Sequence, residues 1–331
     1  VDSNLGNIVN ISRFEGLSKE QAEKLGDNGF VVLNPNSDNA YHYMKMYDIY
    51  EENEYKNIPN FITVDVALHM YHKFFDETLK AVEKEHLHDA LKQLTKNMLE
   101  KTKVLYSQVS HEEIKKDLED IMVYFSVAHK LIHNTYGDLP EKLIPIAEKE
   151  INEIENARGY VKSPLFDFDV NYEQFIVRGH YAGDEALEEY FKTMMWYGLI
   201  GYPFEDGRGV LDYSFIEKAM MITYISFLEM NGSNDILLWD QIYSPTNFFV
   251  GQSDDITIFH MKDLIIKVYG ENATLESIKD EKYRSELEKE IKNLPNPQIQ
   301  NKLITGEVDT PTKKQFRFMG QRYTLDANIM Q

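Results

Sequence analysis

The chain has 331 residues, of which 43% are hydrophobic, 35 are Lys or Arg, 55 are Asp or Glu, and none is Cys. This composition supports a buried core and excludes global disorder, disulfide bonds, a catalytic thiol and zinc–thiolate sites. The net charge of −20 repels phosphate groups, so we expect no nucleic-acid partner and no role at an anionic membrane surface. No apolar run is long enough to span a bilayer, so we expect no transmembrane segment in this chain.

Helical spacing dominates the first half of the chain. Capping-box patterns at 18–21 and 110–113 predict two helix starts, and the first of these helices should end near Gly26. Further helices are predicted over 41–55, over 65–107 as one or two long helices, behind the second capping box, and over 140–156. The runs 30–33 and 61–64 favour short extended segments.

The second half also indicates helices, at 184–199, 212–230, 253–269 and 274–294, followed by a small hairpin over 315–323. The 212–230 helix is apolar on all sides, which predicts a deeply buried position. These patterns predict a mainly α fold, a multi-helix array of long packed helices with a few short strands or a small hairpin. We expect residues 1–331 to form one mainly helical unit, with the loop 159–183 as the place for an internal boundary.

The last residues indicate a chain that continues. The sequence after Thr324 resembles the first turns of a helix, and a helix ending at Gln331 would bury little. We therefore expect these residues to be the N-terminal part of a longer protein.

A stripe of acids and histidines is the densest cluster of chemically active side chains. Asp65, His69, His72 and Asp76 are three or four residues apart, so they share one helical face. Imidazole and carboxylate groups suit a divalent metal ion or a His activated by a carboxylate. The alternative is a solvated polar face, because apolar residues such as Leu68 occupy the opposite side.

Three other patterns carry candidate chemistry. Arg178, His180 and Tyr181 surround Gly179 on a loop, where they would contact a ligand or, alternatively, where the arginine would clamp a carboxylate. His129 continues the apolar stripe of its helix, which favours a buried, hydrogen-bonded core histidine. The segment 167–173 places oxygen ligands at alternate positions, but it matches a calcium loop only in part, so an acidic surface loop is favoured.

Several segments, in order along the chain, resemble a known family. They are Asn57-Ile-Pro-Asn-Phe-Ile-Thr-Val-Asp65 with Leu68-His69, His72 and Phe75-Asp76; Arg178-Gly-His-Tyr181; Tyr190-Phe-Lys-Thr-Met-Met-Trp196; Phe249-Val-Gly251 with Asp254-Asp255; and Phe316-Arg-Phe-Met-Gly-Gln-Arg-Tyr323. Together they resemble the prokaryotic family called domain of unknown function 3160. The chain departs from that pattern at Asp184-Glu185, where the family is more basic.

The resemblance implies an extracytoplasmic protein, either secreted or lipid-anchored at the cell envelope. It implies no established activity, so no catalytic residue is carried over, although Asp65, His69, His72, Arg178 and His180 are motif positions. We expect a binding or structural protein that recognises a glycan, peptide or protein partner. The alternative is an extracytoplasmic hydrolase with a His/carboxylate centre, assisted by a divalent metal ion at Asp65, His69 and His72. Whether the protein is an enzyme stays open at this point.

Overall fold

The computed structural model describes residues 2, 4–13, 17–32, 47–55, 60, 62–206, 208–230, 232, 235–298, 313–322 and 324. Contacts divide the chain into two compact units, Val1–Phe74 and Phe75–Gln331, and each unit is described by itself. The segment 159–183 lies within the second unit. The predicted helix after Thr324 lies outside the described residues.

Before residue 64, the described part of the first unit contains short helices. They are the 3₁₀ turn Ile11–Arg13, α1 (Lys19–Asn28) and α2 (Asp48–Tyr55). The predicted capping box of α1 is confirmed: Ser18 Oγ accepts from the Gln21 amide at 3.2 Å, and Gln21 Oε1 accepts from the Ser18 amide at 2.8 Å. The predicted extended run at 30–33 is wrong for the described residues 30–32, which form no strand.

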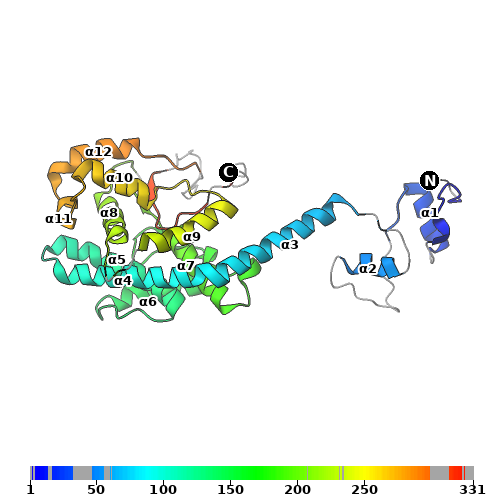
Figure 1. Ribbon diagram of the computed structural model, residues 1–331, viewed down its shortest axis with the longest axis horizontal. Coiled ribbons are helices and arrows are strands. Elements are labelled where there is room, and N and C mark those ends of the chain that lie inside the picture. Colours follow the sequence, from blue (N-terminus) through cyan, green and yellow to red (C-terminus); the bar gives the residue numbers. More distant parts are fainter. Residues whose placement is uncertain are drawn as a thin grey trace. The chain divides into compact units, whose positions relative to one another are not determined.

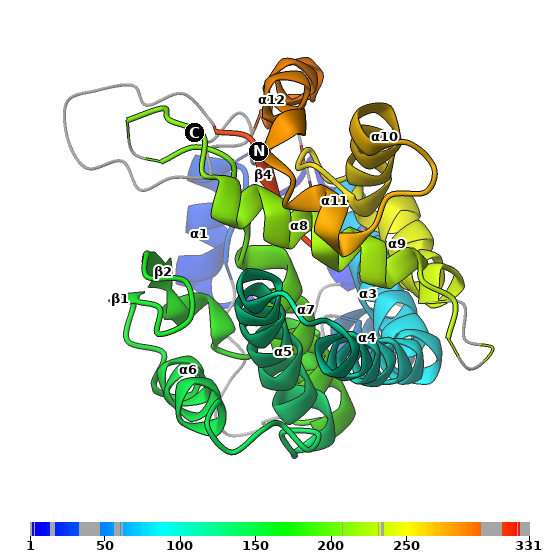
Figure 2. The same ribbon diagram turned by 90° about the vertical axis from the view of Figure 1, so that its left-hand side faces the viewer.

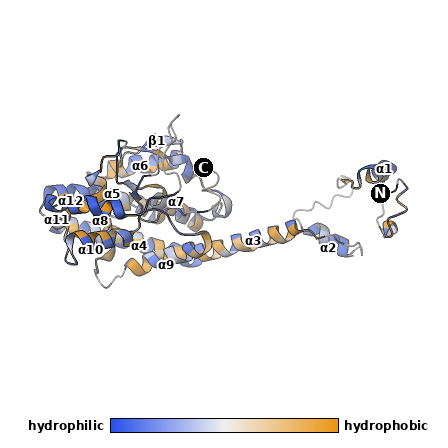
Figure 3. Cartoon of the chain, turned by 90° about the horizontal axis from the view of Figure 1, so that it is seen from above, coloured by the Kyte–Doolittle hydropathy of each residue, from blue (hydrophilic) through white to orange (hydrophobic). Residues whose placement is uncertain are grey.

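The long helical stretch predicted after residue 64 is confirmed. α3 (Val64–Val82) continues through a π-helical turn, Glu83–Leu87, into α4 (His88–Gln108). Hydrophobic and hydrophilic residues alternate along α3 (Figure 3), as expected for a helix with two chemically different faces. The boundary between the two units falls inside α3, between Phe74 and Phe75.

The second unit is built mainly of helices that pack around one core. After α4 they are α5 (Glu112–His133), α6 (Ile144–Asn156), α7 (Glu185–Leu199), α8 (Tyr213–Phe227), α9 (Asp235–Val250), α10 (Ile258–Tyr269), α11 (Leu275–Ile278) and α12 (Arg284–Asn293). α4 packs along α5 and α9, and α8 lies between α5 on one side and α10 and α11 on the other (Figures 1 and 2). This arrangement confirms the mainly α fold.

The predicted burial of the 212–230 helix is confirmed for α8. Ile216, Ala219, Met220, Met221 and Ile222 are fully buried. Neighbouring helices contact α8 on several sides, and these contacts bury its apolar side chains. Its predicted last turn is wrong, because the helix ends at Phe227.

Several predicted helix boundaries are also wrong. α5 begins at Glu112 behind His111, and no side-chain hydrogen bond caps it. α10 begins behind Thr257 instead of Ser253, and α6 begins at Ile144 instead of Pro140. The 274–294 stretch is divided: α11 ends at Ile278, and α12 follows only after the 3₁₀ turn Glu281–Tyr283.

The strands pair differently from the prediction. β1 (Tyr160–Lys162) and β2 (Asp169–Asn171) form an antiparallel hairpin, with Val161 opposite Val170. β4 (Gln315–Phe316) pairs with β3 (Tyr202–Pro203) more than 100 residues earlier. The local hairpin predicted over 315–323 is therefore wrong, because the strand partner is supplied by tertiary packing.

Candidate functional site

Three of the predicted site residues meet in the second unit. Asp76 from α3 and Glu83 from the π-helical turn are two helical turns apart, which places them on one face. His180 lies between them: its Nδ1 is 3.1 Å from Asp76 Oδ1 and its Nε2 is 2.7 Å from Glu83 Oε2. The Tyr181 hydroxyl donates to Glu83 Oε1 at 2.9 Å. We call Asp76, Glu83, His180 and Tyr181 the His180 cluster.

The geometry of the His180 cluster favours a structural clasp. Glu83 is only 6% exposed, and burial raises the pKa of its carboxyl against the opposing effect of the His180 and Tyr181 hydrogen bonds. Burial and the neighbouring Glu83 raise the pKa of Tyr181. Both ring nitrogens of His180 already bond to carboxylates. Neither nitrogen therefore offers a lone pair that could accept a substrate proton or bind a metal ion. The cluster therefore holds the end of α3 against the 179–181 turn.

Arg178 does not belong to this cluster. Its guanidinium donates to the carbonyl oxygens of Gln174 and Ile176, at 3.3 and 3.4 Å, and lies over the ring of Phe191. No carboxylate among the described residues forms an ion pair with it. Arg178 thus fixes its own loop through backbone groups, and Gly179 next to it has the positive φ that a tight turn requires.

Asp65, His69 and His72 lie in the first unit, where they are exposed. Their meeting with Arg178 and His180 stays a prediction from the sequence. Across the part of the chain that the structure describes, no group of three or more His, Asp or Glu side chains is arranged to hold a metal ion. The described helices also include none that is both long and apolar enough to cross a membrane.

The second unit contains a cavity of about 990 Å³ that the sequence did not reveal. It opens between the β1–β2 hairpin, the start of α8, and the segments around Asp255 and Arg317. We call it the hairpin cavity. Its volume lies at the upper end of the range for small-molecule sites, which is roughly 300–1,000 Å³.

One wall of the hairpin cavity is aromatic. Phe166 and Phe168 from the hairpin pack with Phe215 from α8, and their ring centroids are 5.4, 6.3 and 6.0 Å apart. Tyr160 extends this wall on β1 and is exposed. The buried Glu150 of α6 holds the hairpin in place, and the hairpin lies beside α6 in Figure 2.

Another part of the cavity lining is polar and buried. Asp255 is 2% exposed and accepts hydrogen bonds from Gln315 Nε2 and Arg317 Nη1, both at 2.8 Å. Burial raises the pKa of the Asp255 carboxyl, and the charge of Arg317 opposes that shift. The backbone links the same segments, since the Ile256 amide donates to the Gln315 carbonyl at 3.0 Å.

One donor in this polar wall lacks a partner. Arg317 is 8% exposed, and its Nε has no hydrogen-bond acceptor among the described residues. Gly201 allows this arrangement, because a Cβ there would lie 2.9 Å from Gln315 Oε1 and 3.3 Å from Arg317 Nε. An unpaired buried donor costs about 1–3 kcal/mol. A bound molecule that offers an oxygen atom to Arg317 would recover part of that cost.

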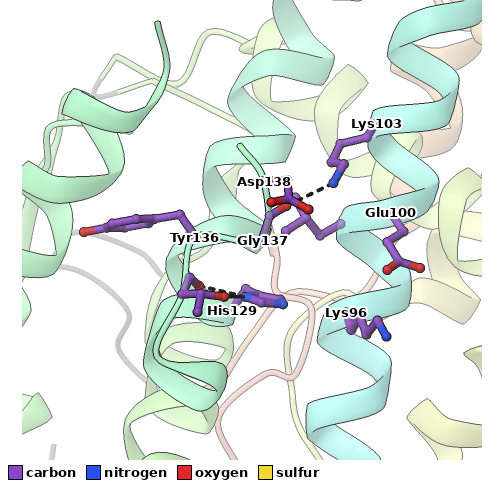
Figure 4. A pocket seen from close by; sticks show the side chains of 9 residues that line it. Lys96, Glu100, Lys103, His129, Tyr136, Gly137 and Asp138 are labelled. Atoms are coloured by element: carbon purple, nitrogen blue, oxygen red, sulfur yellow. Dashed lines mark hydrogen bonds between the residues drawn. The ribbon is translucent and has the colours of Figure 1, made fainter. Parts of the chain in front are cut away.

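A smaller pocket of about 400 Å³ surrounds His129 (Figure 4). Lys96, Glu100 and Lys103 enter it from α4 and His129 from α5, while Tyr136 points away from them. His129 is buried, and its Nδ1 bonds to the Thr135 carbonyl at 2.7 Å. This confirms the predicted core histidine.

His133 stacks on His129 with ring centroids 4.1 Å apart, and its Nε2 bonds to the Lys92 carbonyl at 3.0 Å. Burial lowers the pKa of both histidines. Each ring donates a hydrogen bond to a backbone carbonyl, which is a structural role.

Sequence patterns mark several of the residues that line the hairpin cavity. Asp254-Asp255 and the run from Phe316 lie in segments that resemble the family, and 167–173 is an acidic segment. The structure brings all three to the hairpin cavity, whereas each alone was consistent with a surface loop or a helix start. The sequence does not single out Glu83. Its spacing from Asp76 predicts that both lie on one helical face, but it does not predict that His180, 97 residues away, bonds to them.

The chain belongs to the family described as protein of unknown function (DUF3160), whose pattern it matches over residues 18–331. The match covers nearly the whole chain and confirms the resemblance seen in the sequence motifs. No curated protein and no solved structure matches the chain.

Proposed function

We propose that the protein binds a glycan in the hairpin cavity. The observation that carries this proposal is the pairing of an aromatic wall, Phe166, Phe168 and Phe215, with a buried polar wall that includes the unpartnered Nε of Arg317. Sugars have apolar C–H faces that pack on aromatic rings and hydroxyl groups that both donate and accept hydrogen bonds. A cavity lined by both aromatic rings and fixed donors and acceptors suits both properties.

A hydrolase with a His/carboxylate centre is the less supported alternative. Its best candidate is the His180 cluster, in which both ring nitrogens of His180 are occupied by protein carboxylates. A general base needs a free nitrogen within reach of a substrate proton. The family resemblance supports a location outside the cytoplasm, secreted or lipid-anchored at the envelope, where glycans are abundant ligands. That location remains part of the proposal.

Binding of short oligosaccharides by calorimetry, and the shift that they cause in melting temperature, test the proposal. The panel holds neutral tetrasaccharides of glucose and of N-acetylglucosamine. Phe168→Ala should weaken binding at least about tenfold, which corresponds to roughly 1.4 kcal/mol, because it removes ring surface from the cavity wall. Phe248→Ala is the matched control, since Phe248 is an 83% exposed aromatic residue outside the cavity.

Two results would count against glycan binding. One is a panel in which no sugar binds or shifts the melting temperature. The other is binding that Phe168→Ala and Phe248→Ala weaken equally, because the sugar would then contact an aromatic residue outside the hairpin cavity.

A further inference from the structure

Carboxylates dominate the charge of the hairpin cavity. Seven Asp and Glu side chains line it, against three Lys and Arg side chains. The protein as a whole carries a net charge of −20, so its long-range field adds to the local excess. A cleft with apolar walls and one sign of charge concentrates that field. The electrostatic potential inside the cavity is therefore negative.

The cations of the cavity are engaged by the protein. Arg317 forms its ion pair with Asp255, and Arg322 donates to Thr246 Oγ1 at 2.5 Å while lying over the Tyr243 ring. Lys313 donates to the backbone carbonyl of Asp206. Because these hydrogen bonds use donors of the three cations, fewer donors remain for a negatively charged ligand.

The carboxylates are only partly engaged. Within the described residues, the side chains of Asp169 and Glu205 form no hydrogen bond and no ion pair, although both line the cavity. Asp169 lies on β2, beside the aromatic wall, and Glu205 follows β3 near the polar wall. Two carboxylates thus remain for a ligand: Asp169 beside the aromatic wall, and Glu205 near the polar wall, where it also interacts electrostatically with Lys314.

From this arrangement we infer that the glycan is one with free amino groups, a glucosamine-type oligosaccharide whose ammonium groups pair with Asp169 and Glu205. This inference rests on the proposed function and specifies its ligand class. The ammonium group supplies donors to the free carboxylates, while a ring hydroxyl accepts from the unpartnered Nε of Arg317. Uronic acids and phosphorylated sugars would meet repulsion from the same carboxylates.

The test compares two ligands that share one sugar backbone. A tetrasaccharide of β-linked glucosamine and its fully N-acetylated counterpart have the same linkage and length, and they differ in charge and in the acetyl groups. At pH 6 and low salt, calorimetry should show the amino form binding at least about tenfold tighter, and added salt should reduce this ratio by screening. Asp169→Asn and Glu205→Gln together should lower this ratio, because they remove the two carboxylates that pair with the ammonium groups, while the other acids that line the cavity preserve part of the preference. The matched control is Glu148→Gln, an exposed carboxylate on α6 outside the cavity.

Each outcome separates this inference from glycan binding in general. Equal affinity for the two tetrasaccharides, or a preference for the acetylated one, overturns the inference and leaves the proposed function intact. Absence of binding by any sugar overturns both. A tetralysine peptide that binds as tightly as the amino sugar also overturns the inference, because the cavity would then recognise positive charge alone. A tenfold preference that survives the double substitution overturns the roles given to Asp169 and Glu205.

Discussion

Glu150 connects the helical core to the wall of the hairpin cavity, so its replacement gives a direct test of the structure. Its carboxylate is fully buried on α6 and accepts hydrogen bonds from the Ser163 hydroxyl at 2.9 Å, the Leu165 amide at 3.2 Å, and the Tyr172 hydroxyl. Ser163 and Tyr172 are buried as well. One side chain thus satisfies three donors around the hairpin.

Glu150→Ala should lower the free energy of unfolding by about 2–6 kcal/mol. The Ser163 and Tyr172 hydroxyls would each lose a buried partner, at about 1–3 kcal/mol apiece. The Leu165 amide loses less, because it also bonds to Ser163 Oγ at 3.3 Å. Urea unfolding followed by circular dichroism measures the change, with exposed Glu148→Ala on the same helix as the control, expected to change stability by about 0.5 kcal/mol or less. Equal midpoints for the two variants would refute the role given to Glu150.

The pH dependence of Glu150 provides a second measurement. Burial raises the pKa of this carboxyl above its usual value, against the hydrogen bonds that it accepts. The folded state therefore holds a proton at Glu150 more tightly than the unfolded state does, and the contribution is most favourable below the unfolded pKa. As pH rises from about 4 through the folded pKa, the parent protein should lose stability relative to Glu150→Gln, which cannot titrate. A difference that stays constant between pH 4 and pH 7 would contradict this.

Three further substitutions test other parts of the second unit by urea unfolding. His180→Ala should cost about 1–3 kcal/mol, because it removes a partner of the buried Glu83, and a cost below about 0.5 kcal/mol would argue against the clasp. Met220→Ala should cost about 2–5 kcal/mol, because it leaves a cavity in place of a fully buried side chain, and a near-neutral result would contradict that burial. Lys101→Ala should cost about 3–5 kcal/mol, because it leaves buried Asp235 without the ammonium group 2.7 Å away; an unchanged midpoint would show that the pair does not form.

Local patterns in the sequence determined the helical elements. The capping box at Ser18 predicts α1 because its two hydrogen bonds join residues three apart. The apolar run through Met220 predicts the burial of α8 because no polar face is available to meet solvent. α9 escaped prediction because Pro245 opposes a helix locally, whereas the buried Trp239 and Ile242 stabilise it through tertiary contacts.

The candidate sites depend on contacts between distant segments, which no local pattern encodes. The polar wall needs Asp255 and Arg317, 62 residues apart, and His180 meets Glu83 across 97 residues. The side chain of Asp169 looks like any acid of a surface loop until β2 pairs with β1 and turns that segment toward the cavity. The sequence by itself determined most of the helical segments, because helix hydrogen bonds and side-chain periodicity act over a few residues. Only the tertiary structure decided which charges meet and which stay unpaired among the described residues, because burial and pairing depend on how the helices pack.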